Sequence, residues 1–157
     1  MIHTANALAD EPRNEIVEAL NQSVAETTVT TMLAQNFHWN VTGMAFGPLH
    51  ELFQKIYEDH FEAQDDLAER VKALDGHAEG TLAGMLHRSK VSEHEGQATD
   101  REMIAKLLEA QETLAATLAG CGAIAAQHGD TNTEDLCIER STTHEKFAWF
   151  LRAHLRS

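Results

Sequence analysis

Residues that favour burial recur every three or four positions along four long stretches of the chain, which is the spacing of amphipathic α-helices. Pro12, near the start of the first stretch, suits a first helical turn, where its missing N–H would have had no partner. We therefore predict the first helix over Glu11–Trp39. One of its faces carries Ile16, Leu20, Val24, Thr27, Thr31, Ala34 and His38.

The second stretch has the broadest apolar stripe and is predicted to form a helix from Gly47 to Leu74. Pro48 again falls in the first turn, and Asp75–Gly76 is a signal for a helix C-terminus. A stripe this wide predicts burial on more than one side. It consists of Leu49, Phe53, Ile56, His60, Ala63, Leu67, Val71 and Leu74, widened by Leu52, Phe61 and Ala68.

A long connection follows the second helix, because periodicity is poor from His77 to Gln97. Within it, residues 81–87 (TLAGMLH) are predicted to form a short helix. A connection of this length allows the second and third long helices to run parallel, as in bundles with one crossover.

The last two long helices are predicted over Thr99–Gln127 and Thr133–Leu155. Thr99 or Asp100 is expected to cap the former, and Thr133 is expected to cap the latter. The chain is therefore predicted to be all-α, a four-helix bundle with a short extra helix in the connection between helices two and three. At this length, residues 1–157 are expected to form a single domain with residues 1–10 as a flexible N-terminal arm.

The balance of charged residues limits the kinds of partner that the protein can bind. The chain has 25 acidic residues against 12 Lys and Arg, and its formal net charge of −13 opposes binding to a phosphate backbone and favours cations. No apolar run approaches the ~20 residues that cross a bilayer, and the N-terminus lacks the regions of a signal peptide. We therefore expect a cytoplasmic protein with no membrane partner. In that compartment Cys121 and Cys137 are expected to be reduced, packed residues.

Two histidines and two carboxylates between Asn36 and Gly76 carry the candidate chemistry. His38 and His50 flank a break in the helical pattern, and a tight connection there would bring them together. Asp65 and Glu69 lie four positions apart on one helix face, so both can reach one metal ion. Imidazole and carboxylate together are ligands for iron, zinc or manganese. The alternative is two helix-end histidines bonded to backbone and two acids on a solvated face.

Helix geometry separates the two ligand pairs. His50 and Asp65 are 15 residues apart on one predicted helix, which corresponds to roughly 22 Å at a rise of about 1.5 Å per residue. One ion cannot bind both in the same chain. Either there are two sites, or a second copy related by a two-fold axis supplies its carboxylates to the histidines of the first.

The same stretch resembles the Dps family of mini-ferritins (DNA-binding proteins from starved cells). The family motif has a histidine–tryptophan pair, a second histidine twelve residues later, an acid four residues after that, and then an aspartate and a glutamate one turn apart. His38, Trp39, His50, Asp65 and Glu69 match this pattern. The similarity extends to the four long helical segments and to the closing sequence HEKFAWFLRAHL.

The resemblance implies a ferritin-like fold and a hollow dodecamer of identical subunits. It implies that Fe²⁺ binds between two subunits, is oxidised by H₂O₂ or O₂ and is stored as ferric oxyhydroxide, which protects against oxidative stress. The ferroxidase ligands are then His38, His50, Asp65 and Glu69. Zinc or another divalent ion can bind there in place of iron. Gln54 departs from the family pattern, which usually has an acid there. Its neutral amide predicts a weaker second iron position.

The resemblance also implies roles at two further places. Trp39 and Trp149 would lie near the family's site, where they either donate electrons to radicals or simply pack in the core. Asp130, Glu134 and Asp135 lie at the start of the last helix, where acids are expected for the helix dipole alone. The family's three-fold pores are lined by acids in this region, and Asp135 is the best candidate for guiding cations.

Two other functions stay open. A nucleoid-compacting DNA-binding protein is disfavoured, because residues 1–15 hold one basic residue, Arg13, and three acids; nucleoid association is the corresponding location. A metal-buffering shell with weakened ferroxidase activity is suggested by Gln54. The chain contains no Glu-x-x-His at helical spacing, which argues against a di-iron centre inside one subunit.

Overall fold

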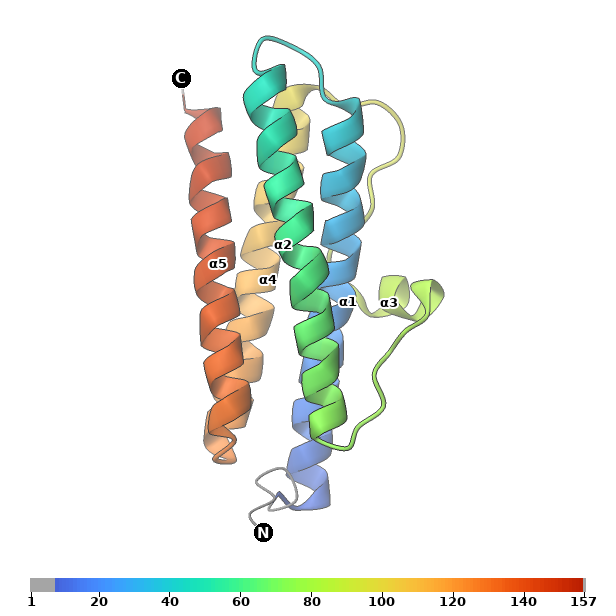
Figure 1. Cartoon of the computed structure of the whole chain (residues 1–157), viewed down its shortest axis with the longest axis vertical. Coiled ribbons are helices and arrows are strands. Elements are labelled where there is room, and N and C mark those ends of the chain that lie inside the picture. Colours follow the sequence, from blue (N-terminus) through green and yellow to red (C-terminus); the bar gives the residue numbers. More distant parts are fainter. Residues whose placement is uncertain (1–7, 157) are drawn as a thin grey trace.

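A computed structural model describes residues 8–156, which form five helices and no strand in that range. Four long helices lie side by side and the short one stands outside them (Figure 1). The elements are α1 Asp10–Asn40, α2 Phe46–Ala73, α3 Leu82–Arg88, α4 Asp100–Gln127 and α5 Thr131–Leu155. Residues 1–7 of the predicted N-terminal arm lie outside the described residues.

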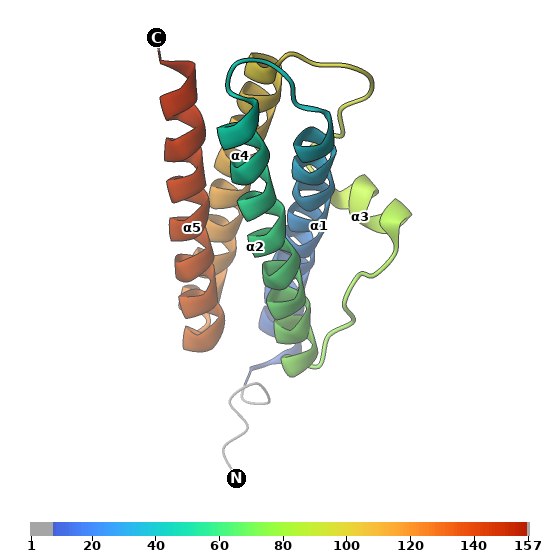
Figure 2. The same ribbon diagram turned by 45° about the horizontal axis from the view of Figure 1, so that its top comes forward.

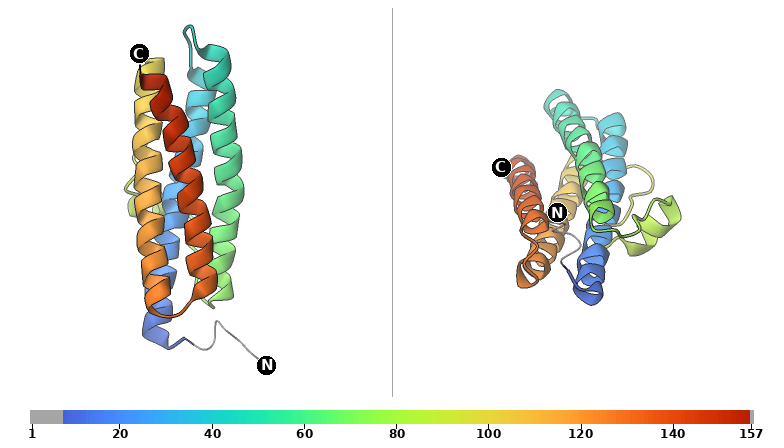
Figure 3. Two further views of the ribbon diagram at one scale, coloured as in Figure 1. Left: turned by 90° about the vertical axis from the view of Figure 1, so that its left-hand side faces the viewer. Right: turned by 60° about the horizontal axis from the view of Figure 1, so that its bottom comes forward.

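The chain forms two antiparallel helix pairs, α1 with α2 and α4 with α5, and these two pairs pack against each other. Residues 74–99 run from the far end of α2 back along the bundle, so α2 and α4 point in the same direction (Figures 1 and 2). The predicted crossover is therefore confirmed. Within this connection α3 lies beside α1, outside the square of the four long helices (Figure 3). None of the described helices is long and apolar enough to cross a membrane.

The N-terminal cap of α4 agrees with the prediction from sequence, and the cap of α5 differs from it. Thr99 caps α4 in a capping box, since its hydroxyl accepts from the Glu102 N–H and its own N–H donates to the Glu102 carboxylate. The predicted cap of the last helix at Thr133 is wrong. Asp130 is the cap, and its carboxylate accepts the N–H of Thr133 at 3.1 Å. A carboxylate therefore takes the position that a hydroxyl three residues later was expected to take.

The end of α2 confirms the predicted stop at Asp75–Gly76. Asp75 has the left-handed φ of 61°, and the Gly76 N–H closes the helix on the Val71 carbonyl at 2.9 Å. The glycine is needed for a different reason. A Cβ on Gly76 would meet the methyl groups of Val17 at 2.7 and 2.8 Å, so α1 and the end of α2 approach too closely for any side chain.

The hydrophobic core is divided along the bundle axis. One cluster lies toward the α1–α2 turn and the other toward the opposite end. Between them lies a group of hydrogen-bonded polar residues from α2, α4 and α5, which we call the central polar layer. It consists of Asp59, His60, Gln111, Arg140 and His144.

Candidate metal centre

The turn between α1 and α2 brings His38 and His50 into contact, as the sequence predicted. Their imidazole rings stack with centroids 3.7 Å apart and planes 18° apart. Two aromatic side chains hold this stack in place: the ring of Phe46 lies against His50 at 5.1 Å, and the edge of Tyr57 meets His38 at 5.2 Å. The two rings are therefore oriented by packing before any metal binds.

Reciprocal hydrogen bonds decide which nitrogens these histidines offer. The Nδ1 of His38 lies 2.7 Å from the carbonyl oxygen of His50, and the Nδ1 of His50 lies 2.7 Å from the carbonyl oxygen of His38. A carbonyl oxygen can only accept, so each Nδ1 carries a proton, and in the neutral ring each Nε2 keeps a lone pair. A backbone carbonyl bonded to one ring nitrogen is the usual support for metal binding by the other. The Nε2 atoms of both histidines are thus the ones available to a ligand.

The carboxylates stand further along the same face of α2. At 100° per residue, His50, Gln54, Asp65 and Glu69 fall within an arc of about 100°. Asp65 and Glu69 are exposed, whereas His50 is half-buried. Among the described residues of a single chain, no three His, Cys, Asp or Glu side chains gather around one point. The chain alone therefore presents two halves of a ligand set, separated along α2.

The structure also shows which acid contacts Gln54. The amide nitrogen of Gln54 donates to a Glu58 carboxylate oxygen at 2.7 Å, so Glu58 lies on the ligand face. Asp59 is turned inward and accepts two hydrogen bonds from Arg140. The spacing of eight residues between His50 and Glu58 is the sequence signal that places Glu58 on the same face of α2.

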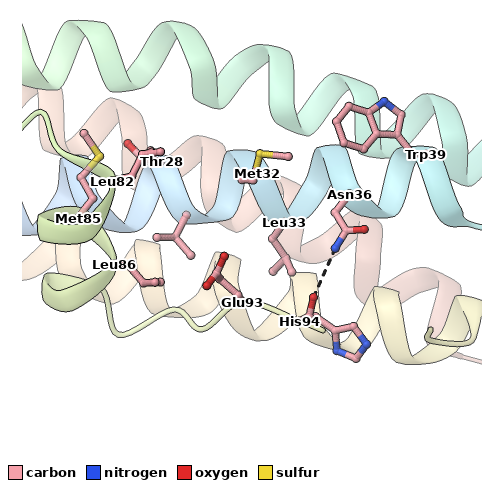
Figure 4. A pocket seen from close by; sticks show the side chains of 11 residues that line it. Thr28, Met32, Leu33, Asn36, Trp39, Leu82, Met85, Leu86, Glu93 and His94 are labelled. Atoms are coloured by element: carbon pink, nitrogen blue, oxygen red, sulfur yellow. Dashed lines mark hydrogen bonds between the residues drawn. The ribbon is translucent and has the colours of Figure 1, made fainter. Parts of the chain in front are cut away.

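The two tryptophans correct the expectation of core packing. Trp39 is 61% exposed and Trp149 is 59% exposed in the single chain. Trp39 borders an apolar groove of about 320 Å³ between α1, α3 and the connection, where the side chains of Met32, Leu82 and Leu86 also lie (Figure 4). One residue that lines the groove, Trp39, directly follows His38 in the sequence.

The three acids near the start of α5 differ from one another. Asp130 is only 8% exposed, caps the helix and pairs with Arg70 at 2.9 Å, so its charge is already matched within the chain. Glu134 is half-buried and Asp135 is exposed. Of the three, Asp135 is the side chain most accessible to a passing cation.

The bundle centre offers no carboxylate for a metal. Burial alone would raise the pKa of Asp59, but hydrogen bonds from His60 and Arg140 hold it below its usual value. Burial lowers the pKa of both His60 and His144. The guanidinium of Arg140 contacts His144 and would repel a metal cation there. This agrees with the missing Glu-x-x-His motif.

Comparison with known proteins now decides the family. The family described as "Ferritin-like domain" matches residues 17–157. General stress protein 20U of Bacillus subtilis (strain 168) is 33% identical over 141 residues, which span 90% of this chain and 97% of that protein. The crystal structure of Dps from Staphylococcus aureus superposes with a TM-score of 0.89 at 33% identity, covering 92% of this chain and 97% of that one. The chain belongs to the Dps family of ferritin-like proteins.

A second solved structure shows the wider relationship of this Dps-family chain. The Dps protein from Vibrio cholerae O1, described as a member of a broad superfamily of ferritin-like diiron-carboxylate proteins, matches with a TM-score of 0.91 and 28% identity. The match covers 95% of this chain and 94% of that one. The predicted family and the ferritin-like four-helix fold are therefore confirmed.

Proposed function

We propose that this Dps-family chain is a ferroxidase that oxidises Fe²⁺ at sites shared between two subunits and stores the product inside a shell of twelve. The observation that carries the proposal is the stacked His38–His50 pair, whose Nε2 atoms are preset as ligands while Asp65 and Glu69 stand on the same helix face without histidine partners. Family membership supports iron as the substrate.

A two-fold axis across the ligand face of α2 would complete the site. Two antiparallel copies of α2 would bring the histidines of one chain to the carboxylates of the other, bridging the ~22 Å that separates His50 from Asp65 in one chain. Exposed apolar side chains along this side of the molecule support burial against a second copy, because large exposed apolar patches usually mark interfaces. They are Met32, Trp39, Phe61, Leu82 and Leu86.

Each part of the ligand set has a distinct task in iron oxidation. Asp65 and Glu69 are hard anionic ligands that stabilise Fe³⁺ more than Fe²⁺, which favours loss of an electron. His38 and His50 are proposed to hold the ions through Nε2, with Gln54 beside the weaker second position. Two Fe²⁺ ions give one electron each to H₂O₂, which takes up two protons and leaves as two waters. Zinc would compete for the same ligands without undergoing oxidation.

The distribution of charged residues bears on how iron enters and on the other candidate functions. Asp135, with Glu134 behind it, is proposed to guide Fe²⁺ toward the interior, whereas Asp130 serves as a cap. The net charge of −13 disfavours direct binding to duplex DNA. A salt-sensitive shift of plasmid by the metal-free protein would favour the nucleoid alternative. Failure to oxidise Fe²⁺ while still binding it would favour a metal-buffering shell.

Complementation between two broken variants tests the shared site. One variant carries His38→Ala and His50→Ala, and the other carries Asp65→Ala and Glu69→Ala. Each alone should be nearly inactive. After the two are unfolded, mixed equally and reassembled, about half of the dimers should be mixed and about a quarter of all sites should regain both halves. Activity that stays at background, with assembly confirmed by size, would rule out the shared site, since a site within one chain cannot be restored by mixing.

A further inference from the structure

The central polar layer forms a closed ring of hydrogen bonds. Asp59 accepts from His60 Nδ1 at 3.0 Å, and His60 Nε2 lies 2.9 Å from the Gln111 amide nitrogen. The Gln111 amide oxygen accepts from His144 Nδ1 at 2.7 Å, and His144 Nε2 lies 3.3 Å from Arg140. Arg140 closes the ring on Asp59 at 2.7 Å.

This ring can be satisfied only when both histidines are neutral. Asp59 requires a proton on His60 Nδ1, and Gln111 then donates to the bare His60 Nε2 and accepts from His144 Nδ1–H. The remaining His144 Nε2 accepts from Arg140. Turning the Gln111 amide over would require a charged His60 and would set a His144 N–H against the guanidinium. The observed orientation is thus the one in which every ring nitrogen has a complementary partner.

The charged groups around the two histidine rings are already paired with each other. His60, Gln111 and His144 are fully buried, and the rings of the two histidines meet edge to face at 4.8 Å. Asp59 from α2 and Arg140 from α5 are the charged groups that act on them, and they neutralise each other. α4 contributes the neutral amide.

The neighbouring groups on the other side add no charge either. α5 also places the apolar ring of Phe147 against His60 at 5.8 Å. The one buried carboxylate of α1, Glu26, is engaged elsewhere by Gln22, the Lys90 N–H and Thr117. A proton added to His60 would have to share Asp59 with Arg140, and a proton added to His144 would have no anion in contact with it.

The ring joins the two halves of the bundle. Asp59 and His60 belong to the α1–α2 pair, whereas the other three members belong to the α4–α5 pair. α2 and α5 have few other close approaches, and Gln111 reaches His60 across the bundle interior. We propose that this ring is an acid-sensitive lock: protonation of His60 or His144 opens the bundle between the α1–α2 pair and the α4–α5 pair.

A single proton is enough to open the lock. On His60 it would point an N–H at the Gln111 amino group, and on His144 it would point an N–H at Arg140. Each case replaces a buried hydrogen bond by two opposed donors, and the second also places two cations together. The ring then has no alternative arrangement that keeps all five side chains paired.

The direction of the pH effect follows from burial, which lowers the pKa of both histidines in the folded chain. Above the unfolded-state pKa of about 6.5 both states are neutral and the lock is fully stabilising. Below it the unfolded chain takes up protons that the folded chain excludes. The unfolding constant should rise about tenfold per pH unit for each histidine, or about a hundredfold for both, until the folded groups titrate.

Substitution of single histidines tests this slope. The guanidinium midpoint and the hydrogen exchange of α2 and α5 amides, corrected for intrinsic rates, are measured between pH 7.5 and 5. In the wild type the unfolding constant should rise about a hundredfold per pH unit of acidification. In His60→Gln and in His144→Gln it should rise only about tenfold per pH unit, because one histidine remains. His87→Gln, at an exposed site, is the matched control and should leave the slope unchanged. Equal slopes in the wild type, both variants and the control would overturn the proposal.

A second measurement on the wild-type protein keeps the proposal testable if a variant fails to fold. Nitrogen chemical shifts of the histidine rings report tautomer and charge directly. His60 and His144 should stay neutral, with Nδ1 protonated, until exchange protection in α2 and α5 is lost. A charged His60 or His144 in a chain whose central amides remain protected would show that the ring tolerates protonation and is no lock.

Discussion

Two pairs of histidines touch each other within residues 8–156, and they differ in which ring nitrogens they leave without a partner. At the α1–α2 turn, His38 and His50 use only Nδ1 for hydrogen bonds to backbone carbonyls. At the bundle centre, His60 and His144 have both ring nitrogens bonded to side chains. Only the first pair leaves ring nitrogens free for a ligand.

The difference comes from what lies opposite each ring. A backbone carbonyl fixes the tautomer of one ring nitrogen and does not reach the other, so the turn supports a ligand without consuming it. A glutamine, an arginine and a carboxylate on three helices surround the central pair on all sides. Contact between histidines is therefore no indication of a metal site until the partners of all four nitrogens are known.

The largest expected effect separates the pairs by activity. His50→Ala removes one Nε2 ligand and one of the two carbonyl bonds at the turn, and it should slow Fe²⁺ oxidation by more than about a hundredfold. Stopped-flow absorbance of Fe³⁺ formation measures this rate. His87→Ala, on the exposed face of α3, is the control and should match the wild type. Unchanged oxidation in His50→Ala would remove the turn pair from the ferroxidase site.

A smaller effect separates the pairs by stability. Gln111→Leu leaves His60 Nε2 without a donor and His144 Nδ1–H without an acceptor, and it should lower the free energy of unfolding by about 2–3 kcal/mol at pH 7.5. Guanidinium unfolding followed by circular dichroism measures the loss, with Gln127→Leu at an exposed position of α4 as the control.

The rate of Fe²⁺ oxidation per assembled Gln111→Leu shell should stay at the wild-type value. A proportionate fall in that rate would mean that the two pairs are coupled through α2 and are not separate devices.

The smallest effect sharpens the ligand side of the comparison. Gln54→Glu restores an anionic ligand one turn from His50 and should tighten the weaker iron position by about tenfold. Anaerobic Fe²⁺ calorimetry counts and ranks the positions, and Gln127→Glu controls for added charge alone. Two equal positions in the wild-type protein would show that Glu58, bonded to Gln54 at 2.7 Å, already supplies the missing charge.

The arrangement of the helices was largely predictable from sequence because apolar periodicity and capping are local signals. The approach of His38 to His50 was also predictable, since a short turn joins the ends of their helices. The reciprocal hydrogen bonds between each Nδ1 and the other residue's carbonyl were not predictable, because they depend on the directions of the two backbone carbonyls at the turn. Ligand assignments for Asp65 and Glu69 stay predictions that only a second chain can test.

Long-range pairing explains the remaining misses. His60 was placed on the apolar stripe, but its partners Gln111 and His144 are 51 and 84 positions away, and no local pattern links them. Asp130 was assigned to a pore because its pairing with Arg70, 60 positions earlier, has no sequence signature. For Trp39 and Trp149 the sequence left core packing and a role near the metal site open, and their exposure depends on how much of the surface faces a second chain.

The close contact at Gly76 sets a limit on how this protein can be altered. Saturation mutagenesis of residues 74–80, followed by selection for folded protein, should recover glycine alone at position 76, because even alanine would meet the Val17 methyls at 2.7 and 2.8 Å. Pairing the library with Val17→Ala or Val17→Gly should restore tolerance to small residues. A substitution at Val17 could thus compensate for a side chain at position 76, so the packing of α1 against α2 can be adjusted at the end of the bundle opposite the His38–His50 pair.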